Sequence, residues 1–123
     1  MTPIRVALAD DATAYRTLLR VVLEQDGRFE IVGEAADGAE AVQLSALEQP
    51  DVLLLDLAMP VMDGLQAIPE IRSQSPDTKI VVLSGFSYSR LGEDAESLGA
   101  TAYLEKGTSL ETIADTVVAL RDD

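Results

Sequence analysis

The sequence predicts an α/β fold with an open parallel sheet that is covered by helices on both faces. Two observations predict this class. Five short apolar runs rich in Val, Ile and Leu recur along the chain, and amphipathic stretches of helical length lie between them. Apolar runs without polar alternation are typical of strands buried on both faces of a sheet. Regular alternation of strands and helices indicates right-handed βαβ units.

The apolar runs are the predicted strands, and turn signals separate them from the helices. Pairs such as Asp26-Gly27, Asp37-Gly38 and Asp63-Gly64 are typical of turns and helix ends. Similar signals at Gln49-Pro50, in the Ser-Pro-Asp turn of residues 75–77 and at Leu98-Gly99 complete the set. The predicted strands are Ile4–Ala9, Phe29–Ala35, Val52–Leu55, Ile80–Ser84 and Thr101–Leu104.

Apolar residues at 3.6-residue spacing predict the helices. The spacing residues are Tyr15, Leu18, Leu19, Val22 and Leu23 in the first helix, Ala41, Leu44 and Leu47 in the second, and Ile113, Val117 and Leu120 in the last. The third helical stretch, 65–72, contains Pro69, which would remove a backbone hydrogen bond and crowd the preceding turn. We therefore expect this helix to start late, with Pro69 near its first turn, or to be kinked.

Length and composition indicate one domain over residues 1–123. A chain of 123 residues is of ordinary domain size, and it contains no linker or low-complexity tract. It has no cysteine and no histidine, which excludes disulfides, thiolate metal sites and a phosphohistidine on this chain. The formal net charge of −13 disfavours binding to nucleic acid or to an anionic membrane. No signal peptide or membrane span is recognisable, so we expect a cytoplasmic location.

Polar residues gather where the predicted strands end. Asp10 and Asp11 follow the first strand, Asp56 follows the third, Ser84 ends the fourth, and Lys106 lies just after the fifth. Ligands of open parallel sheets bind outside the carboxyl ends of the strands, where the strand order reverses. If the order is 2-1-3-4-5, this reversal brings the three carboxylates into one crevice, with the hydroxyl and the ammonium on its far side.

Such a crevice requires a cation. Two like charges about 4 Å apart repel by about 4 kcal/mol at an effective dielectric constant of 20. Because all the available ligands are oxygens, the fitting ion is Mg²⁺, with Mn²⁺ as an alternative. A metal and a lysine that face one carboxylate form a site for an incoming phosphoryl group. Asp56 is then placed as the nucleophile, with Lys106 and Ser84 contacting phosphoryl oxygens.

Four segments carry a resemblance that covers essentially the whole chain. They are ALADD at 7–11, LLLDLAMPVMDG at 53–64, VVLSG at 81–85 and YLEKG at 103–107. Together, in this order, they resemble the receiver domain of two-component response regulators. The resemblance implies a doubly wound, flavodoxin-like (βα)5 three-layer sandwich with strand order 2-1-3-4-5. It also implies a phosphorylation-dependent signalling switch rather than an enzyme with a separate substrate.

The resemblance implies a role for each matching residue. Asp56 resembles the aspartate that accepts a phosphoryl group from a phosphohistidine of a sensor histidine kinase or phosphotransfer protein. Asp10 and Asp11 resemble the acidic pair that binds Mg²⁺ together with Asp56, and the backbone carbonyl of Ala58 would be a further ligand. Lys106 resembles the lysine that pairs with the phosphoryl oxygens.

Two further positions resemble the conformational switch of the family. Ser84 matches the hydroxyl drawn toward the phosphoryl group, and Tyr103 matches the aromatic residue that changes rotamer with it. The output would come from the face built by the fourth helix, the fifth strand and the fifth helix. Tyr88, Leu91, Leu98 and Tyr103 are candidate members of this face, which a partner or a second copy of the domain would recognise.

The sequence departs from the family pattern at three positions. Gly107 follows Lys106 where many members have proline, a variant that resembles receivers preceding helix-turn-helix DNA-binding domains. Ala58 and Phe86 lie two residues beyond Asp56 and Ser84, where polar residues in the family orient the hydrolytic water. Neither side chain can orient water, so we expect slow loss of the phosphoryl group.

Other interpretations of these residues remain open. Asp10 and Asp11 could simply cap the first helix, and Tyr103 could be an ordinary core aromatic. A phosphatase of the haloacid dehalogenase type would need an acid at the position of Ala58, so the sequence argues against it. The remaining alternative function is a phosphate-independent, receiver-like protein-binding module.

Overall fold

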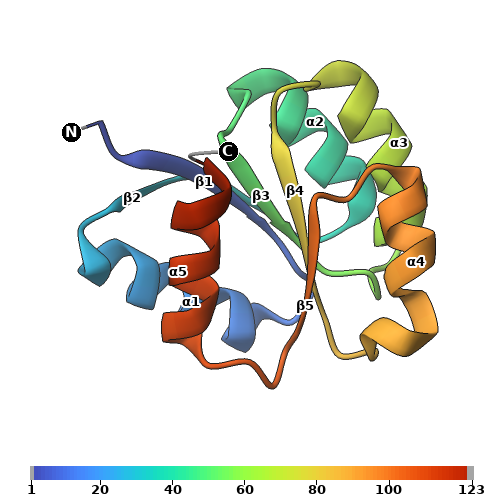
Figure 1. The fold of residues 1–123 in the computed structure, drawn as a ribbon. Helices are drawn as coiled ribbons and strands as arrows, with labels where there is room; N and C mark the ends of the chain where they lie inside the picture. The colour runs from blue at the N-terminus through green and yellow to red at the C-terminus, as the bar shows by residue number, and fades with distance from the viewer. Residues whose placement is uncertain (1, 122–123) are drawn as a thin grey trace.

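The computed structural model describes residues 2–121, which form five strands and five helices in strict alternation (Figure 1). The strands are β1 (Ile4–Ala9), β2 (Phe29–Ala35), β3 (Val52–Leu55), β4 (Lys79–Ser84) and β5 (Ala102–Glu105). The helices are α1 (Thr13–Asp26), α2 (Gly38–Glu48), α3 (Gly64–Gln74), α4 (Tyr88–Leu98) and α5 (Leu110–Arg121). The predicted fold class is confirmed, and the strand boundaries differ from the predicted ones by at most one residue.

All strand pairs are parallel, and the sheet order is β2-β1-β3-β4-β5. Helices α1 and α5 cover one face, and α2, α3 and α4 cover the other (Figure 1). The strand order implied by the resemblance is therefore confirmed. The reversal lies between β1 and β3, where Ala9 pairs with Leu55, so residues that follow these two strands lie next to each other.

Strand side chains alternate between two cores, one on each face of the sheet. In β3, for example, Leu53 and Leu55 pack under α2, α3 and α4, whereas Val52 and Leu54 pack under α1 and α5. These four side chains are at most 2% exposed. Burial on both faces explains why the run is apolar throughout, because each position lies in one of the two cores.

Helix α3 differs from its prediction. It begins at Gly64 rather than late, and Pro69 lies inside it. Its start is fixed by a capping box, in which the Asp63 side chain accepts a hydrogen bond from the Gln66 N–H at 2.8 Å and the Gln66 side chain accepts one from the Asp63 N–H at 3.0 Å. Cap chemistry therefore overrides the local preference of Pro69, and the expected late start is wrong.

Two residues of the predicted helical faces are exposed. Leu18 of α1 is 48% exposed and Leu47 of α2 is 79% exposed. On α1, the predicted Leu19 and Leu23 are the buried residues. Leu47 lies in the last turn of α2, beyond Ser45, the last buried residue of that helix. Periodicity identified both helices correctly but did not fix which apolar residues face the sheet.

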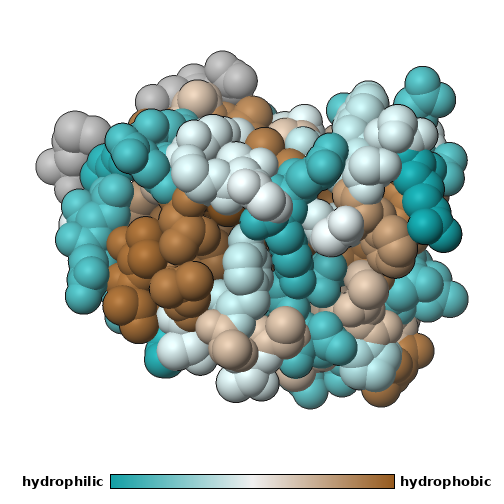
Figure 2. Space-filling view, turned by 90° about the horizontal axis from the view of Figure 1, so that it is seen from below, coloured by the Kyte–Doolittle hydropathy of each residue, from teal (hydrophilic) through white to brown (hydrophobic). Residues whose placement is uncertain are grey.

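The carboxyl ends of the strands lie at the bottom of the molecule in Figure 1, and Figure 2 views this end directly. Hydrophilic residues lie across the middle of this face, with a hydrophobic area at its left (Figure 2). Within residues 2–121, no helix is long and apolar enough to cross a membrane. The same residues contain no cis peptide bond, so the Lys106–Gly107 peptide is trans.

We expect Pro69→Ala to raise the free energy of unfolding by about 2 kcal/mol. Pro69 is exposed and has no N–H to donate to the Leu65 carbonyl four residues before it, and alanine restores this hydrogen bond. Urea denaturation measures the change, with Glu70→Ala at the next exposed position as the control. An unchanged or lower stability of Pro69→Ala would contradict the interpretation.

Candidate functional site

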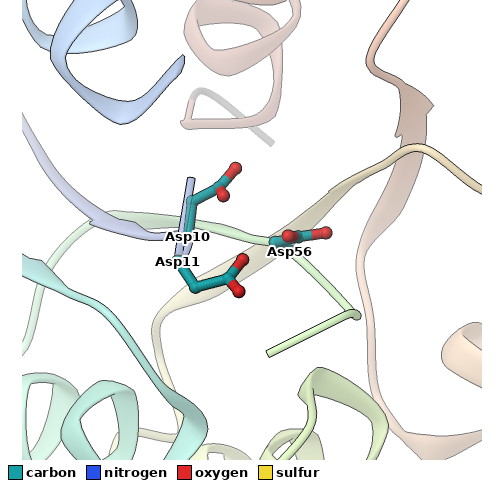
Figure 3. Close-up of side chains that lie close together, drawn as sticks. All are labelled: Asp10, Asp11 and Asp56. Carbon is teal, nitrogen blue, oxygen red and sulfur yellow. The ribbon is translucent and has the colours of Figure 1, made fainter. Parts of the chain in front are cut away.

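Three carboxylates meet at the carboxyl ends of β1 and β3. Asp10 and Asp11 follow β1, Asp56 follows β3, and one oxygen from each lies within 4.8 Å of the others (Figure 3). The Asp56 N–H donates to the Ala9 carbonyl at 2.9 Å, which extends the β1–β3 pairing to the site itself. Asp10 and Asp56 are 3% and 4% exposed, whereas Asp11 faces solvent. The predicted crevice is therefore present, with two buried acids and one at its mouth.

Lys106 contacts both buried acids. Its ammonium Nζ lies 2.8 Å from Asp10 Oδ2 and 3.4 Å from Asp56 Oδ2. The Lys106 N–H donates to the Ser84 carbonyl at 2.8 Å, which fixes the backbone of the lysine beside the end of β4. The lysine side chain is 24% exposed, so its charge is partly shielded from water. The sequence placed Lys106 opposite Asp56, but the shorter contact is with Asp10.

Burial and charge shift the pKa values of this group. Burial, and then the negative charge of Asp10, raise the pKa of Asp56, and the nearby Lys106 offsets only part of this effect. Burial lowers the pKa of Lys106, but the hydrogen bond with Asp10 and the two negative charges outweigh it, so the net pKa is raised. Lys106 therefore stays protonated, whereas the ionised form of the Asp56 carboxyl is destabilised.

The loop from β3 to α3 is held close under Asp56. A Cβ added at Gly64 would lie 2.3 Å from the Asp56 carbonyl oxygen, so only glycine fits where the loop returns. The Gly64 N–H donates to the Leu57 carbonyl at 2.9 Å. Val61, at the tip of the loop, has φ +67° and is 85% exposed. The loop thus carries backbone strain beside the site, because a β-branched residue disfavours this region of φ.

The remaining predicted site residues lie around the β4–α4 loop and the β3–α3 loop. Ser84 is fully buried, and its Oγ accepts a hydrogen bond from the Phe86 N–H at 3.0 Å. Tyr103 is half-buried and donates its hydroxyl to the Phe86 carbonyl at 2.8 Å. Ala58 is exposed, and its N–H lies 3.4 Å from Asp56 Oδ1. The structure thus joins Ser84 and Tyr103 through one residue, Phe86.

The capping interpretation of the acidic pair is wrong for α1. The N-cap residue is Ala12, and no side chain caps it. Asp10 Oδ1 instead accepts a hydrogen bond from the Ala12 N–H at 2.8 Å, before the helix begins. This bond orients the Asp10 carboxylate, whose other oxygen pairs with Lys106.

Sequence reasoning missed the contacts that two residues of α1 make. The Tyr15 ring lies beneath the Lys106 ammonium, with Nζ 4.8 Å from the ring centroid. The Arg16 guanidinium donates to the Asp10 carbonyl and pairs with Glu34 at 2.8 Å. The available signal was the placement of an aromatic and a basic residue in the turn that follows the acidic pair. The sequence instead assigned Tyr15 to the apolar spacing of the helix.

The donor set fits a hard divalent cation. Three carboxylates and one ammonium leave surplus negative charge, and all the ligand atoms on offer are oxygens. Buried like charges of this kind require a cation or a proton. Asp56, Lys106 and such a cation would together form an anion-accepting site around one nucleophilic oxygen.

The fold and this site define an α/β domain with an acidic crevice at its topological switch point. Residues 6–118 match the family model of the response regulator receiver domain. The chain therefore belongs to the receiver domain family of two-component response regulators.

Individual relatives agree with this membership. The transcriptional regulatory protein PdtaR of Mycobacterium tuberculosis is 44% identical over 111 residues, which cover 90% of this chain and 53% of PdtaR. The receiver domain of the response regulator NarL of the same species has a TM-score of 0.94 at 32% identity, covering 99% and 98% of the two chains. A response regulator from Burkholderia pseudomallei, solved with a phosphorylated aspartic acid, a calcium ion and citrate, has a TM-score of 0.82 at 27% identity, covering 94% and 71%. This chain spans about half the length of the curated relatives it matches.

We expect Asp56→Asn to be more stable than wild type at pH 7.5 in the absence of divalent cations. The folded protein binds the Asp56 proton more tightly than the unfolded chain does, so ionisation of this carboxyl opposes folding above its ordinary pKa. Each unit of pKa elevation corresponds to about 1.4 kcal/mol. The advantage of the variant should therefore shrink as the pH falls through the raised pKa toward the ordinary value near ~4.

Urea denaturation in EDTA at pH 7.5 and pH 4.5 measures this difference. Asp77→Asn, which removes an exposed acid in the turn before β4, is the matched control for the loss of one carboxylate away from the site. A wild type that is more stable than Asp56→Asn at pH 7.5 would show that Lys106 outweighs burial.

Proposed function

We propose that this protein is a phosphorylation-dependent switch in which Asp56 accepts a phosphoryl group from a phosphohistidine of a sensor kinase or phosphotransfer protein. The observation that carries the proposal is the placement of Asp56. Asp56 lies at the carboxyl end of β3, with its Oδ2 3.4 Å from Lys106 Nζ. One of its carboxylate oxygens lies within 4.8 Å of an oxygen from each of the other two carboxylates. Since these 123 residues contain no histidine, the phosphohistidine would lie outside them.

Phosphoryl transfer to Asp56 requires mainly that the protein position the reactants and neutralise charge. An Asp56 carboxylate oxygen attacks phosphorus, the P–N bond of the phosphohistidine breaks, and the imidazole keeps the electron pair. The product is an acyl phosphate on Asp56. Mg²⁺, held by Asp10, Asp11, Asp56 and the Ala58 carbonyl, would neutralise phosphoryl charge, with Mn²⁺ as a substitute. Lys106 would exchange its contact with Asp10 for a phosphoryl oxygen.

The signal would leave the site through the β4–α4 loop. Ser84 and Tyr103 both bond to Phe86, so a Ser84 hydroxyl drawn to the phosphoryl group would disturb the acceptor of the Tyr103 hydroxyl. Tyr103 in turn packs edge-on against Tyr88 of α4, with ring centroids 5.7 Å apart. The output face would be α4, β5 and α5, which a partner or a second copy of the domain would bind.

The relatives support this proposal. The Burkholderia structure carries a phosphorylated aspartic acid and a divalent cation within the same fold. PdtaR is named as a transcriptional regulator and is nearly twice as long as the matched region. By analogy, we propose that this domain controls a transcriptional output module, which would contact nucleic acid where the receiver does not.

We expect wild-type protein incubated with acetyl phosphate and Mg²⁺ to gain one phosphoryl group, detected by intact mass spectrometry. The gain should be absent in EDTA and absent in Asp56→Asn. Asp77→Asn, which removes a distant exposed acid, should be phosphorylated like wild type.

Other outcomes would separate the alternatives. If wild type gains no phosphoryl group and binds no beryllofluoride, the phosphate-independent binding module becomes the better account. If Asp56→Asn is modified as fully as wild type, another residue is the acceptor.

We also expect the phosphorylated protein to lose its phosphoryl group slowly. Ala58 is exposed beside Asp56 but has no polar group, and the Phe86 ring lies 5.0 Å from the Arg90 guanidinium. Neither side chain can orient a hydrolytic water. Ala58→Asn and Phe86→Glu should therefore shorten the lifetime about tenfold or more. The decay of the phosphorylated mass after removal of acetyl phosphate measures it, and rapid loss that neither variant alters would refute this prediction.

A further inference from the structure

The Lys106 ammonium has an aromatic ring on the side that faces α1. Its Nζ lies 4.8 Å from the centroid of the Tyr15 ring, within the range of an attractive cation–π contact. The same ammonium lies 2.8 Å from Asp10 Oδ2 and 3.4 Å from Asp56 Oδ2. The two carboxylates and the ring therefore define where the charge of Lys106 is held.

The Tyr15 hydroxyl does not explain this placement. Its oxygen is buried and has no hydrogen-bond partner among the described residues. Buried polar groups that serve as donors or acceptors normally have a partner. Burial raises the pKa of the Tyr15 hydroxyl, so the ring stays neutral and presents its negative face to the ammonium. The ring face of Tyr15, rather than its hydroxyl, is therefore the part that interacts with Lys106.

One chain segment places both the acid and the ring. Asp10 is oriented by its hydrogen bond from the Ala12 N–H, and Tyr15 follows in the first turn of α1. The Arg16 side chain ties this turn back to the Asp10 carbonyl. The segment that follows β1 thus fixes Asp10 and Tyr15, two partners of Lys106, relative to each other.

We infer that Tyr15 is a positioning residue for Lys106, an inference that rests on the proposed function of Asp56. Transfer to Asp56 requires the ammonium to leave Asp10 for a phosphoryl oxygen. A hydrogen bond to Asp10 is directional and is lost on this movement, whereas attraction to a ring face tolerates displacement across the ring. The ring keeps the ammonium at the site during the exchange and limits the access of water to it.

The test compares wild type with Tyr15→Phe, Tyr15→Leu and Tyr15→Met. Tyr15→Phe keeps the ring and removes only the hydroxyl, so its affinity for beryllofluoride in Mg²⁺ should stay within about twofold of wild type. The two variants without a ring should lose affinity by about threefold to thirtyfold, the range of one cation–π contact. Calorimetry measures binding, and mass spectrometry measures the phosphorylation rate at several acetyl phosphate concentrations.

A second readout separates positioning from damage to the fold. Affinity for Mg²⁺ alone should be the same in all four proteins, because Tyr15 offers no metal ligand. The inference is supported if Tyr15→Leu and Tyr15→Met bind beryllofluoride more weakly while Tyr15→Phe binds it like wild type. The affinity for Mg²⁺ must be unchanged in all of them.

Each remaining outcome overturns it. Wild-type affinity in both ringless variants shows that the ring is dispensable, and an equal loss in Tyr15→Phe shows that the hydroxyl matters instead. A parallel loss of Mg²⁺ affinity shows that the crevice itself has been disturbed. Wild type that binds no beryllofluoride overturns the proposed function and this inference together, whereas the other outcomes leave the proposed function standing.

Discussion

The surplus negative charge at the carboxyl ends of β1 and β3 is the constraint on which the rest of the site depends. Asp10, Asp11 and Asp56 lie together, and Lys106 pairs with the two that are almost fully buried, Asp10 and Asp56. Burial, and then the negative charge of Asp10, raise the pKa of Asp56, so ionisation of this carboxyl opposes folding. The same surplus charge fits the crevice to a divalent cation and, under the proposed function, to a phosphoryl group.

The scaffold tolerates this charge because its stability comes from elsewhere. Two apolar cores on opposite faces of the sheet bury strand side chains almost completely, as Leu53 and Val52 show on adjacent positions of β3. Close backbone approaches, such as Gly64 under the Asp56 carbonyl, then fix the loops around the acids. Hydrophobic burial is roughly proportional to area and indifferent to the charges at the strand ends. The apolar residues within each strand can therefore stabilise the fold while the charged residues at its carboxyl end form the site.

Most of the fold, and the set of residues at the site, could be predicted from the sequence. Strands buried on both faces read as unbroken apolar runs, and the residues after them must meet at one edge of a parallel sheet. Three features could not be predicted. Periodicity does not say which apolar residue faces the sheet, so the spacing placed Leu18 on the apolar face although it is 48% exposed. Proline propensity was overridden by the Asp63 capping box. The contact of Tyr15 with Lys106 joins residues 91 positions apart, which spacing rules do not address.

The proposed switch places its input and output on one short loop. Ser84 and Tyr103 come from neighbouring strands, and both are bonded to the backbone of Phe86, the first through its N–H and the second through its carbonyl. Because Phe86 is hydrogen-bonded through both its N–H and its carbonyl, a displacement of either Ser84 or Tyr103 is transmitted to the other. If phosphorylation of Asp56 changes the environment of Tyr103 and Tyr88, then a partner bound at that face must, by linkage, change the phosphorylation equilibrium by the same factor. The output partner of this domain is therefore also expected to act on its phosphorylation.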